Sequence, residues 1–165
     1  MSFLPHSKGE LKPQRRCQES ALGLLSRRDH SQYELMQKLL MKGFSHSDVE
    51  QAILYCQHYG YIDDLRYALS VIRQHISKGH GERRIRQSLQ QNRVSDDLIV
   101  IAFSQVEIDW FELAKQAADK KFNSCASIDR KTQAKRIRFL QYRGFSFEQI
   151  QYALSDLSEI ENESA

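Results

Sequence analysis

The sequence predicts an all-α protein made of three tandem three-helix repeats that form an elongated, curved array. The chain of 165 residues has only two prolines, Pro5 and Pro13, so no later proline can interrupt a helix. Strand-forming residues are scarce, with five valines and one threonine. A pattern of helix ends also recurs about every fifty residues. These observations exclude an all-β fold and argue against a parallel α/β sheet.

The clearest helix signals lie in the first third of the chain. Ser31 and Glu34 have the spacing of a capping box, which predicts that a helix begins at Ser31. Gly43 ends this helix, because glycine readily takes the left-handed conformation of a C-terminal cap. A second helix is predicted over 45–59, with Gly60 as its end.

The same succession appears three times, anchored on a leucine at a helix end. Each anchor is followed by a cap residue, an apolar residue, a serine that can begin the next helix, and then two apolar residues. The matching sets are Leu39, Gly43, Phe44, Ser45, Ala52 and Ile53; Leu89, Arg93, Val94, Ser95, Ala102 and Phe103; and Leu140, Gly144, Phe145, Ser146, Ala153 and Leu154. Because Arg93 replaces the cap glycine, we expect the middle turn to be built differently.

Each copy is preceded by a further apolar helix, at 21–25, 65–72 and 110–122. The sequence therefore predicts nine helices of about a dozen residues, close to the usual helix length. One such unit would be only marginally stable, and stacking buries the apolar faces of its neighbours.

The predicted boundaries follow from this pattern. They are a flexible arm at 1–14, repeats at 15–62, 63–107 and 108–158, and an acidic tail at 159–165, with a polar linker at 123–129 inside the third repeat.

The net charge of +3 conceals bands of opposite sign. The strongest basic band, residues 115–143, holds nine basic and two acidic residues, and residues 1–28 and 79–93 are also basic. Residues 94–114 and 144–165 each hold five acidic residues and no basic one. The surface is therefore predicted to be banded rather than neutral.

Two basic stripes are the candidate binding surfaces. Lys131, Lys135, Arg138 and Tyr142 share one face of a predicted helix, where cations can neutralise phosphates and the ring can stack. A comparable polar face contains Arg83 and is completed by Arg86, Gln87 and Gln90. The full candidate set is Arg27, Arg28, Arg83, Arg84, Arg86, Lys131, Lys135, Arg136, Arg138, Tyr142 and Arg143. The alternative interpretation is that these are ordinary solvated helix faces.

Motifs for catalysis are incomplete. The segment 79–84 begins like a dinucleotide-binding loop, but Arg84 stands where a third glycine is needed, so we interpret it as a turn before a helix. Ser45 lies in a near match to a nucleophile elbow and is better explained as a helix cap. Asp63 and Asp64 are interpreted as residues that favour a helix N-terminus rather than as a catalytic pair.

Three separated cysteines, Cys17, Cys56 and Cys125, form no metal-binding or disulfide pattern, and His58 near Cys56 is too little for a metal site. We expect no catalytic residue, metal or cofactor, and hence no enzyme. The longest apolar run, 98–103, is far shorter than the roughly 18 residues that span a bilayer. A cytoplasmic monomer without membrane contact is expected.

At these motifs the chain resembles the RecX family of bacterial regulators of the RecA recombinase. The resemblance covers about 21–154. The segments that carry it are Ala21-Leu-Gly-Leu-Leu-Ser-Arg-Arg28, Ser31-Gln-Tyr-Glu-Leu35, Lys42-Gly-Phe44, Gly60-Tyr-Ile-Asp-Asp64, Arg66-Tyr-Ala68, Lys78-Gly79, Gly81, Arg84-Ile-Arg86, and Arg138-Phe-Leu-Gln-Tyr-Arg-Gly-Phe-Ser146 with Ile150.

The resemblance implies a non-catalytic regulator that binds the RecA filament on single-stranded DNA in its helical groove. Such a protein would restrain ATP hydrolysis, filament extension and strand exchange, and so moderate recombination and the SOS response. Two alternatives remain open, namely a nucleic-acid-binding module that acts on bare single-stranded DNA and a helical adaptor for another protein.

Overall fold

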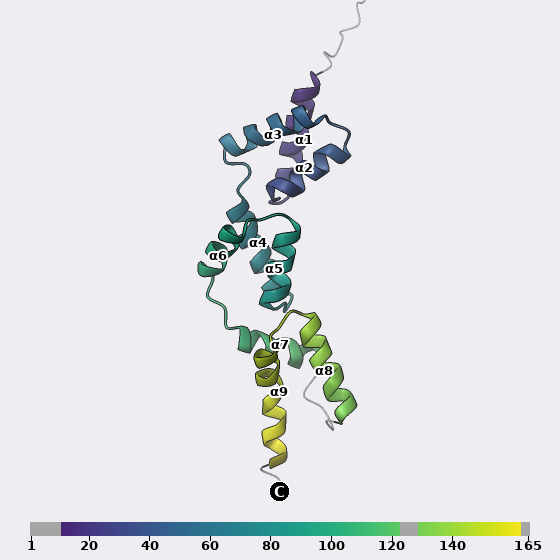
Figure 1. Ribbon diagram of the computed structural model, residues 1–165, viewed down its shortest axis with the longest axis vertical. Helices are drawn as coiled ribbons and strands as arrows, with labels where there is room; N and C mark the ends of the chain where they lie inside the picture. Colours follow the sequence, from purple (N-terminus) through teal and green to yellow (C-terminus); the bar gives the residue numbers. More distant parts are fainter. Residues whose placement is uncertain (1–10, 123–128, 163–165) are drawn as a thin grey trace, which may run out of the picture. The chain divides into compact units, whose positions relative to one another are not determined.

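The structure is a computed structural model that describes residues 11–122 and 129–162, and side chains as far as residue 155 (Figure 1). Residues 1–10 of the predicted arm (1–14), residues 123–128 of the predicted linker (123–129) and residues 163–165 of the predicted tail (159–165) lie outside the described residues.

The described residues form nine helices and no strand, which confirms the all-α prediction. The helices are α1 (Pro13–Leu25), α2 (Gln32–Met41), α3 (His46–His58), α4 (Asp64–Ser77), α5 (Glu82–Gln91), α6 (Asp96–Ser104), α7 (Trp110–Phe122), α8 (Arg130–Tyr142) and α9 (Phe147–Asn162).

Described helices extend into both predicted terminal segments, the arm and the tail. Helix α1 begins at Pro13 rather than after residue 14, since a proline in the first turn has no N–H that would need a partner. Helix α9 extends to Asn162, within the segment expected to be a tail. The other repeat boundaries remain predictions.

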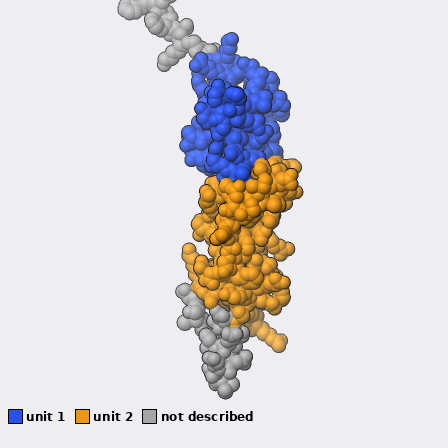
Figure 2. All heavy atoms as spheres, turned by 90° about the vertical axis from the view of Figure 1, so that its left-hand side faces the viewer, with its two compact units in different colours: residues 1–67 blue, residues 68–165 orange. Residues whose placement is uncertain are grey.

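The chain divides into two compact units, residues 1–67 and 68–165, which Figure 2 colours separately. In unit 1, helix α1 packs chiefly on α3, and α2 closes the core. Its buried core consists of Cys17, Ala21, Leu35, Leu39, Val49, Ala52, Ile53, Cys56 and Ile62.

Unit 2 contains the rest of α4 and helices α5 to α9. Helix α7 packs on α9, and α8 lies against both. The core at this end consists of Ala114, Ala118, Leu140, Phe145, Ile150, Ala153 and Leu154. Residues of α4 to α6 supply further buried side chains, among them Ile72, Ile85, Leu89 and Ile99.

The repeated turn is the same in all three copies. The backbone N–H two residues beyond the helix cap donates to the anchor carbonyl, from Phe44 to Leu39 at 3.4 Å, from Val94 to Leu89 at 3.1 Å and from Phe145 to Leu140 at 3.2 Å. This is the Schellman hydrogen bond, which needs a left-handed residue after the cap.

The expectation of a different middle turn was wrong. Gly43 and Gly144 have φ of 92° and 96°, and Arg93 takes φ of 57° in the same turn. A non-glycine residue can occupy the left-handed region at a modest cost in conformational free energy, so the middle copy keeps the same turn with Arg93 in place of glycine.

Serine caps begin the following helices as predicted. The Oγ atoms of Ser31, Ser45, Ser95 and Ser146 accept hydrogen bonds from backbone N–H groups at 3.0, 3.2, 3.4 and 3.3 Å. At α9 the Gln149 side chain also accepts from the Ser146 N–H at 2.9 Å, which completes a capping box.

We predict that truncating an anchor leucine destabilises its repeat. Leu39, Leu89 and Leu140 are fully buried, so Leu→Ala should lower the free energy of unfolding by about 2–5 kcal/mol. Urea denaturation followed by circular dichroism measures this loss. Leu54→Ala, at an exposed position, is the control, and an equal loss there would contradict the assignment of the anchors to the core.

Candidate functional site

Within unit 2, the N-terminus of α5 meets the C-terminus of α8 through main-chain atoms. The Gly81 N–H donates to the Arg143 carbonyl at 2.7 Å, and the Arg83 N–H donates to the Gly144 carbonyl at 3.2 Å. The Arg143 guanidinium donates in turn to the Lys78 carbonyl at 2.6 Å. Free N–H groups at one helix end are therefore satisfied by free carbonyls at another.

This contact requires both glycines. A Cβ atom at Gly81 would lie 2.4 Å from the carbonyl carbon of Gly144. A Cβ atom at Gly144 would lie 2.6 Å from both the N and the Cβ of Arg84. The sequence segment 79–84, interpreted as a turn before a helix, is thus also the joint between two repeats.

The joint forms one side of a polar groove of about 580 Å³ between α5 and α8. No acidic residue is among its lining residues, all of which belong to the described part of unit 2. They are His75, Arg83, Arg84, Gln87, Ser88, Gln91, Gln141, Tyr142 and Gly144. The groove brings together residues from both predicted basic stripes.

An arginine and a ring meet at the groove. The Arg84 Cζ lies 5.1 Å from the centroid of the Tyr142 ring, within the range of a cation–π contact. Tyr142 is 77% exposed, so its ring is open to a ligand. Guanidinium, amide and phenol groups side by side can bind a phosphate or carboxylate and stack on a planar group.

The α8 stripe is exposed as the sequence predicted. Lys131, Lys135, Arg138 and Tyr142 all lie on the solvent face, and Leu140 is buried on the other. Their part in binding remains a prediction.

Arg136 differs from the other candidates of α8 because its side chain is buried. It is only 5% exposed, and its Cζ lies 5.4 Å from the centroid of the Phe122 ring. Its Nε has no hydrogen-bond partner among the described residues. The cause is helical geometry, because Arg136 is one turn before Leu140 and shares its buried face.

Two other candidates are held by internal contacts. Arg86 pairs with Glu82 at 2.7 Å and lies over the Phe103 ring at 4.6 Å, so Arg83 and Gln87 line the groove without it. Arg143 lies 4.9 Å from the centroid of Phe139 while it bonds to the Lys78 carbonyl. Both side chains have a structural role whatever else they bind.

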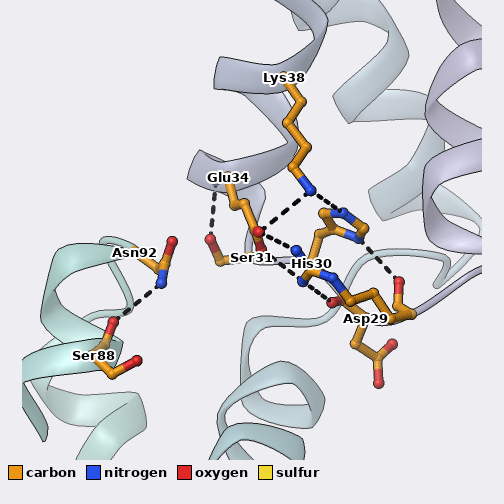
Figure 3. Close-up of polar contacts among 8 residues, drawn as sticks. Asp29, His30, Ser31, Glu34, Lys38, Ser88 and Asn92 are labelled. Atoms are coloured by element: carbon orange, nitrogen blue, oxygen red, sulfur yellow. Dashed lines mark hydrogen bonds and ion pairs between the residues drawn. The ribbon is translucent and has the colours of Figure 1, made fainter. Parts of the chain in front are cut away.

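The candidates of unit 1 differ from each other. Arg27 is exposed, whereas Arg28 is paired with the Glu34 carboxylate through both of its terminal nitrogens. Lys38 lies 3.6 Å from the same carboxylate (Figure 3). Burial alone would raise the pKa of the Glu34 carboxyl, but the Arg28 hydrogen bond and charge outweigh it and hold that pKa below its usual value.

His30 completes this network and is held in one neutral form. Its Nε2 lies 3.0 Å from the Lys38 ammonium, and its Nδ1 lies 3.0 Å from the Arg28 carbonyl (Figure 3). Because an ammonium only donates and a carbonyl only accepts, Nε2 accepts and Nδ1 carries the proton. Burial lowers the pKa of His30, in agreement with this neutral form.

A pair of histidines in unit 2, His75 and His80, was missed by sequence reasoning. The Nδ1 atoms of His75 and His80 lie 2.8 Å apart, so one ring donates to the other. Burial lowers the pKa of both, and with Arg84 and other nearby cations it takes that of His80 to about 4. Sequence spacing alone does not indicate that two histidines five residues apart will meet across a helix end.

Asp63, considered from the sequence as a catalytic acid, caps a helix, and Cys17 and Cys56, considered as metal ligands, lie in the core. The Asp63 carboxylate accepts from the Leu65 and Arg66 N–H groups at 2.9 and 3.1 Å, which confirms its capping interpretation. Burial raises the pKa of the Cys17 and Cys56 thiols, and Cys125 lies outside the described residues. Residues 11–122 and 129–155 contain no group of three or more potential metal ligands.

None of the helices in the described part of the chain is long and apolar enough to cross a membrane.

Family models for three successive domains match the chain. They are the first, second and third three-helix domains of RecX, at residues 17–56, 63–102 and 107–154. The chain belongs to the RecX family. The tandem helical-repeat fold and the resemblance predicted from the sequence are thereby confirmed.

Members of the RecX family from several bacteria are close in sequence and length. A "Regulatory protein RecX" of Vibrio vulnificus is 59% identical over 144 residues, which cover 87% of this chain and 94% of the relative. Its namesake from Yersinia enterocolitica is 39% identical over 160 aligned residues, covering 84% and 96%.

Solved RecX structures share the fold. The crystal structure of RecX from Lactobacillus salivarius matches with a TM-score of 0.70 at 20% identity, over 88% of this chain and 97% of that one. A second crystal structure of a regulatory protein RecX matches with a TM-score of 0.73 at 25% identity, over 87% and 73%.

We predict that Gly144→Ala damages this RecX-family chain more than Gly43→Ala. Both glycines have the same turn and nearly the same φ, so both variants should lose about 1–2 kcal/mol to left-handed strain. Only Gly144→Ala adds an overlap with the Arg84 backbone, since the Cβ site at Gly43 is open. Amide hydrogen exchange should show faster exchange at Gly81 and Arg83. If both variants lost the same stability and the exchange of these two amides did not change, the close contact between Gly144 and α5 would be contradicted.

The buried His80 predicts a pH dependence. Because the folded-state pKa of His80 lies below that of the unfolded chain, its contribution to stability is complete above about pH 6.5 and is lost as the pH falls toward 4. Denaturation at several pH values measures this loss. His80→Gln should flatten the curve in this window, and parallel curves for both proteins would refute the prediction.

Proposed function

We propose that the chain is a negative regulator of the RecA recombinase. It binds the RecA filament on single-stranded DNA in the helical groove of that filament and inhibits ATP hydrolysis, filament extension and strand exchange. Recombination and the SOS response are thereby moderated. The support is the family membership, the name "Regulatory protein RecX" carried by the relatives, and the cationic groove between α5 and α8.

The groove is the observation that carries the proposal. Arg83 and Arg84 line it, and Lys135 and Arg138 extend its positive charge along the exposed face of α8. A filament offers such a surface both DNA phosphates and acidic protein side chains, and charge complementarity steers the encounter.

The mode of action that we propose is non-catalytic. Regulation by occupying the filament needs only complementary surfaces, and the polar groups of the groove bind and orient rather than react. The chain acts in the cytoplasm as a monomer, without a cofactor.

The DNA-dependent ATPase of RecA tests this proposal. Substoichiometric chain should lower the ATPase, and Lys135→Glu/Arg138→Glu should weaken inhibition about tenfold or more by replacing attraction with repulsion. Both positions are exposed, so the circular dichroism spectrum and melting temperature should not change. Lys42→Glu/Arg73→Glu is the matched control, with the same change in net charge at exposed positions elsewhere.

An unchanged ATPase over a full titration with the parent chain would overturn the proposed function. Equal inhibition by the Lys135→Glu/Arg138→Glu variant and the control would instead identify the α8 stripe as a solvated face.

The second candidate is a module that binds bare single-stranded DNA, favoured by the exposed Tyr142 ring beside Arg84. It predicts tight, steeply salt-dependent binding to an oligonucleotide without recombinase. A helical adaptor for another protein would respond in neither assay.

A further inference from the structure

Aromatic side chains gather at the end of α3, in unit 1. The ring centroids of Tyr55 and Tyr59 are 4.7 Å apart, and those of Tyr59 and Tyr61 are 5.9 Å apart with an interplanar angle of 25°. His58 meets the edge of the Tyr59 ring at 4.9 Å. Tyr59 and Tyr61 are 57% and 44% exposed, so this tyrosine cluster, Tyr55, Tyr59 and Tyr61, reaches the surface.

The backbone beneath the tyrosine cluster is fixed by several hydrogen bonds. The Tyr61 N–H donates to the Cys56 carbonyl at 2.8 Å. The Arg66 guanidinium donates to the Gly60 and Tyr61 carbonyls at 3.2 and 3.1 Å and to the Asp29 carboxylate at 3.1 Å. The rings are thus presented by an ordered turn, which lowers the entropy lost when a ligand binds.

Tyr55 joins the tyrosine cluster to a groove of about 760 Å³ between α1 and α3. The groove is lined by Leu11, Lys12, Gln14, Arg15, Gln18, Gln51, Ala52 and Tyr55. This set, all within the described residues of unit 1, contains two cations, three glutamines and no acidic side chain. Arg15 can still attract an anion, because its ion pair with Glu19 is long, at 3.9 Å, and both side chains are largely exposed.

We propose that this surface binds a single strand of nucleic acid. Bases stack on Tyr59 and Tyr61, and phosphates lie at Lys12 and Arg15. Rings beside cations are the combination that holds single strands without sequence preference, since every base has a π face and every nucleotide has a phosphate. The glutamine amides add hydrogen-bonding groups for base edges.

The inference is independent of the proposed regulation of RecA, and it shares its ligand, single-stranded nucleic acid, with the second candidate function. It uses residues of unit 1 that belong to neither basic stripe, and variants of these residues test it without any recombinase. A failure here leaves the ATPase result unaffected, and a failure of the ATPase test leaves this surface intact.

Fluorescence anisotropy of a labelled oligothymidylate with the full chain tests the proposal. Tyr59→Ala/Tyr61→Ala should weaken binding at least about tenfold, whereas Tyr59→Phe/Tyr61→Phe should stay within about twofold because the rings remain. Lys12→Gln/Arg15→Gln should reduce the slope of log affinity against log salt by about one for each phosphate that the variant no longer neutralises. Leu54→Ala, 63% exposed on the same helix but without a ring, is the control and should bind as the parent does.

Photo-crosslinking with a 5-iodouridine oligonucleotide, followed by peptide mapping, locates the strand on the unaltered protein. Crosslinks at Tyr59 or Tyr61 support the proposal. Crosslinks confined to residues 68–165, parent-like affinity of the double alanine variant, or equal losses in the phenylalanine and alanine variants would each overturn it. Binding of a proline-rich peptide but not of the oligonucleotide would also overturn it and would assign the rings to a protein partner.

Discussion

The main-chain contact between Gly81 and Gly144 is the constraint on which unit 2 depends. Two helix ends approach so closely that neither position can carry a Cβ atom, and the N–H groups of one end bond to the carbonyls of the other. The contact aligns α5 with α8 and thereby forms the groove in which Arg84 meets Tyr142. A side chain introduced at either glycine would push α5 and α8 apart and change the shape of the groove without touching a ligand.

Much of the fold follows from local chemistry that a sequence displays. Serine caps, left-handed cap residues and apolar spacing act within one or two helical turns, which is why the helices and their threefold succession could be predicted. The turn at Arg93 shows the limit of this reasoning. Glycine is the usual residue there, yet the hydrogen bonds of the repeat hold an arginine in the same conformation.

The candidate site was less predictable, because charge in a sequence does not reveal burial or pairing. Arg136 belonged to the most basic band and is covered by the core, while Arg28 is occupied by Glu34. The shared exposed face of the α8 stripe was predicted correctly from helical spacing. Its meeting with α5 depends on a contact between residues more than sixty positions apart, for which a single sequence gives no signal.

The joined helix ends also limit how the groove can hold an anion. A helix N-terminus usually binds phosphate through its free N–H groups and its dipole. At α5 the carbonyls of Arg143 and Gly144, just after the end of α8, already occupy two of these donors, the N–H groups of Gly81 and Arg83. Recognition of an anion in the groove therefore rests mainly on arginine and glutamine side chains rather than on main-chain N–H groups, which favours salt-sensitive attraction.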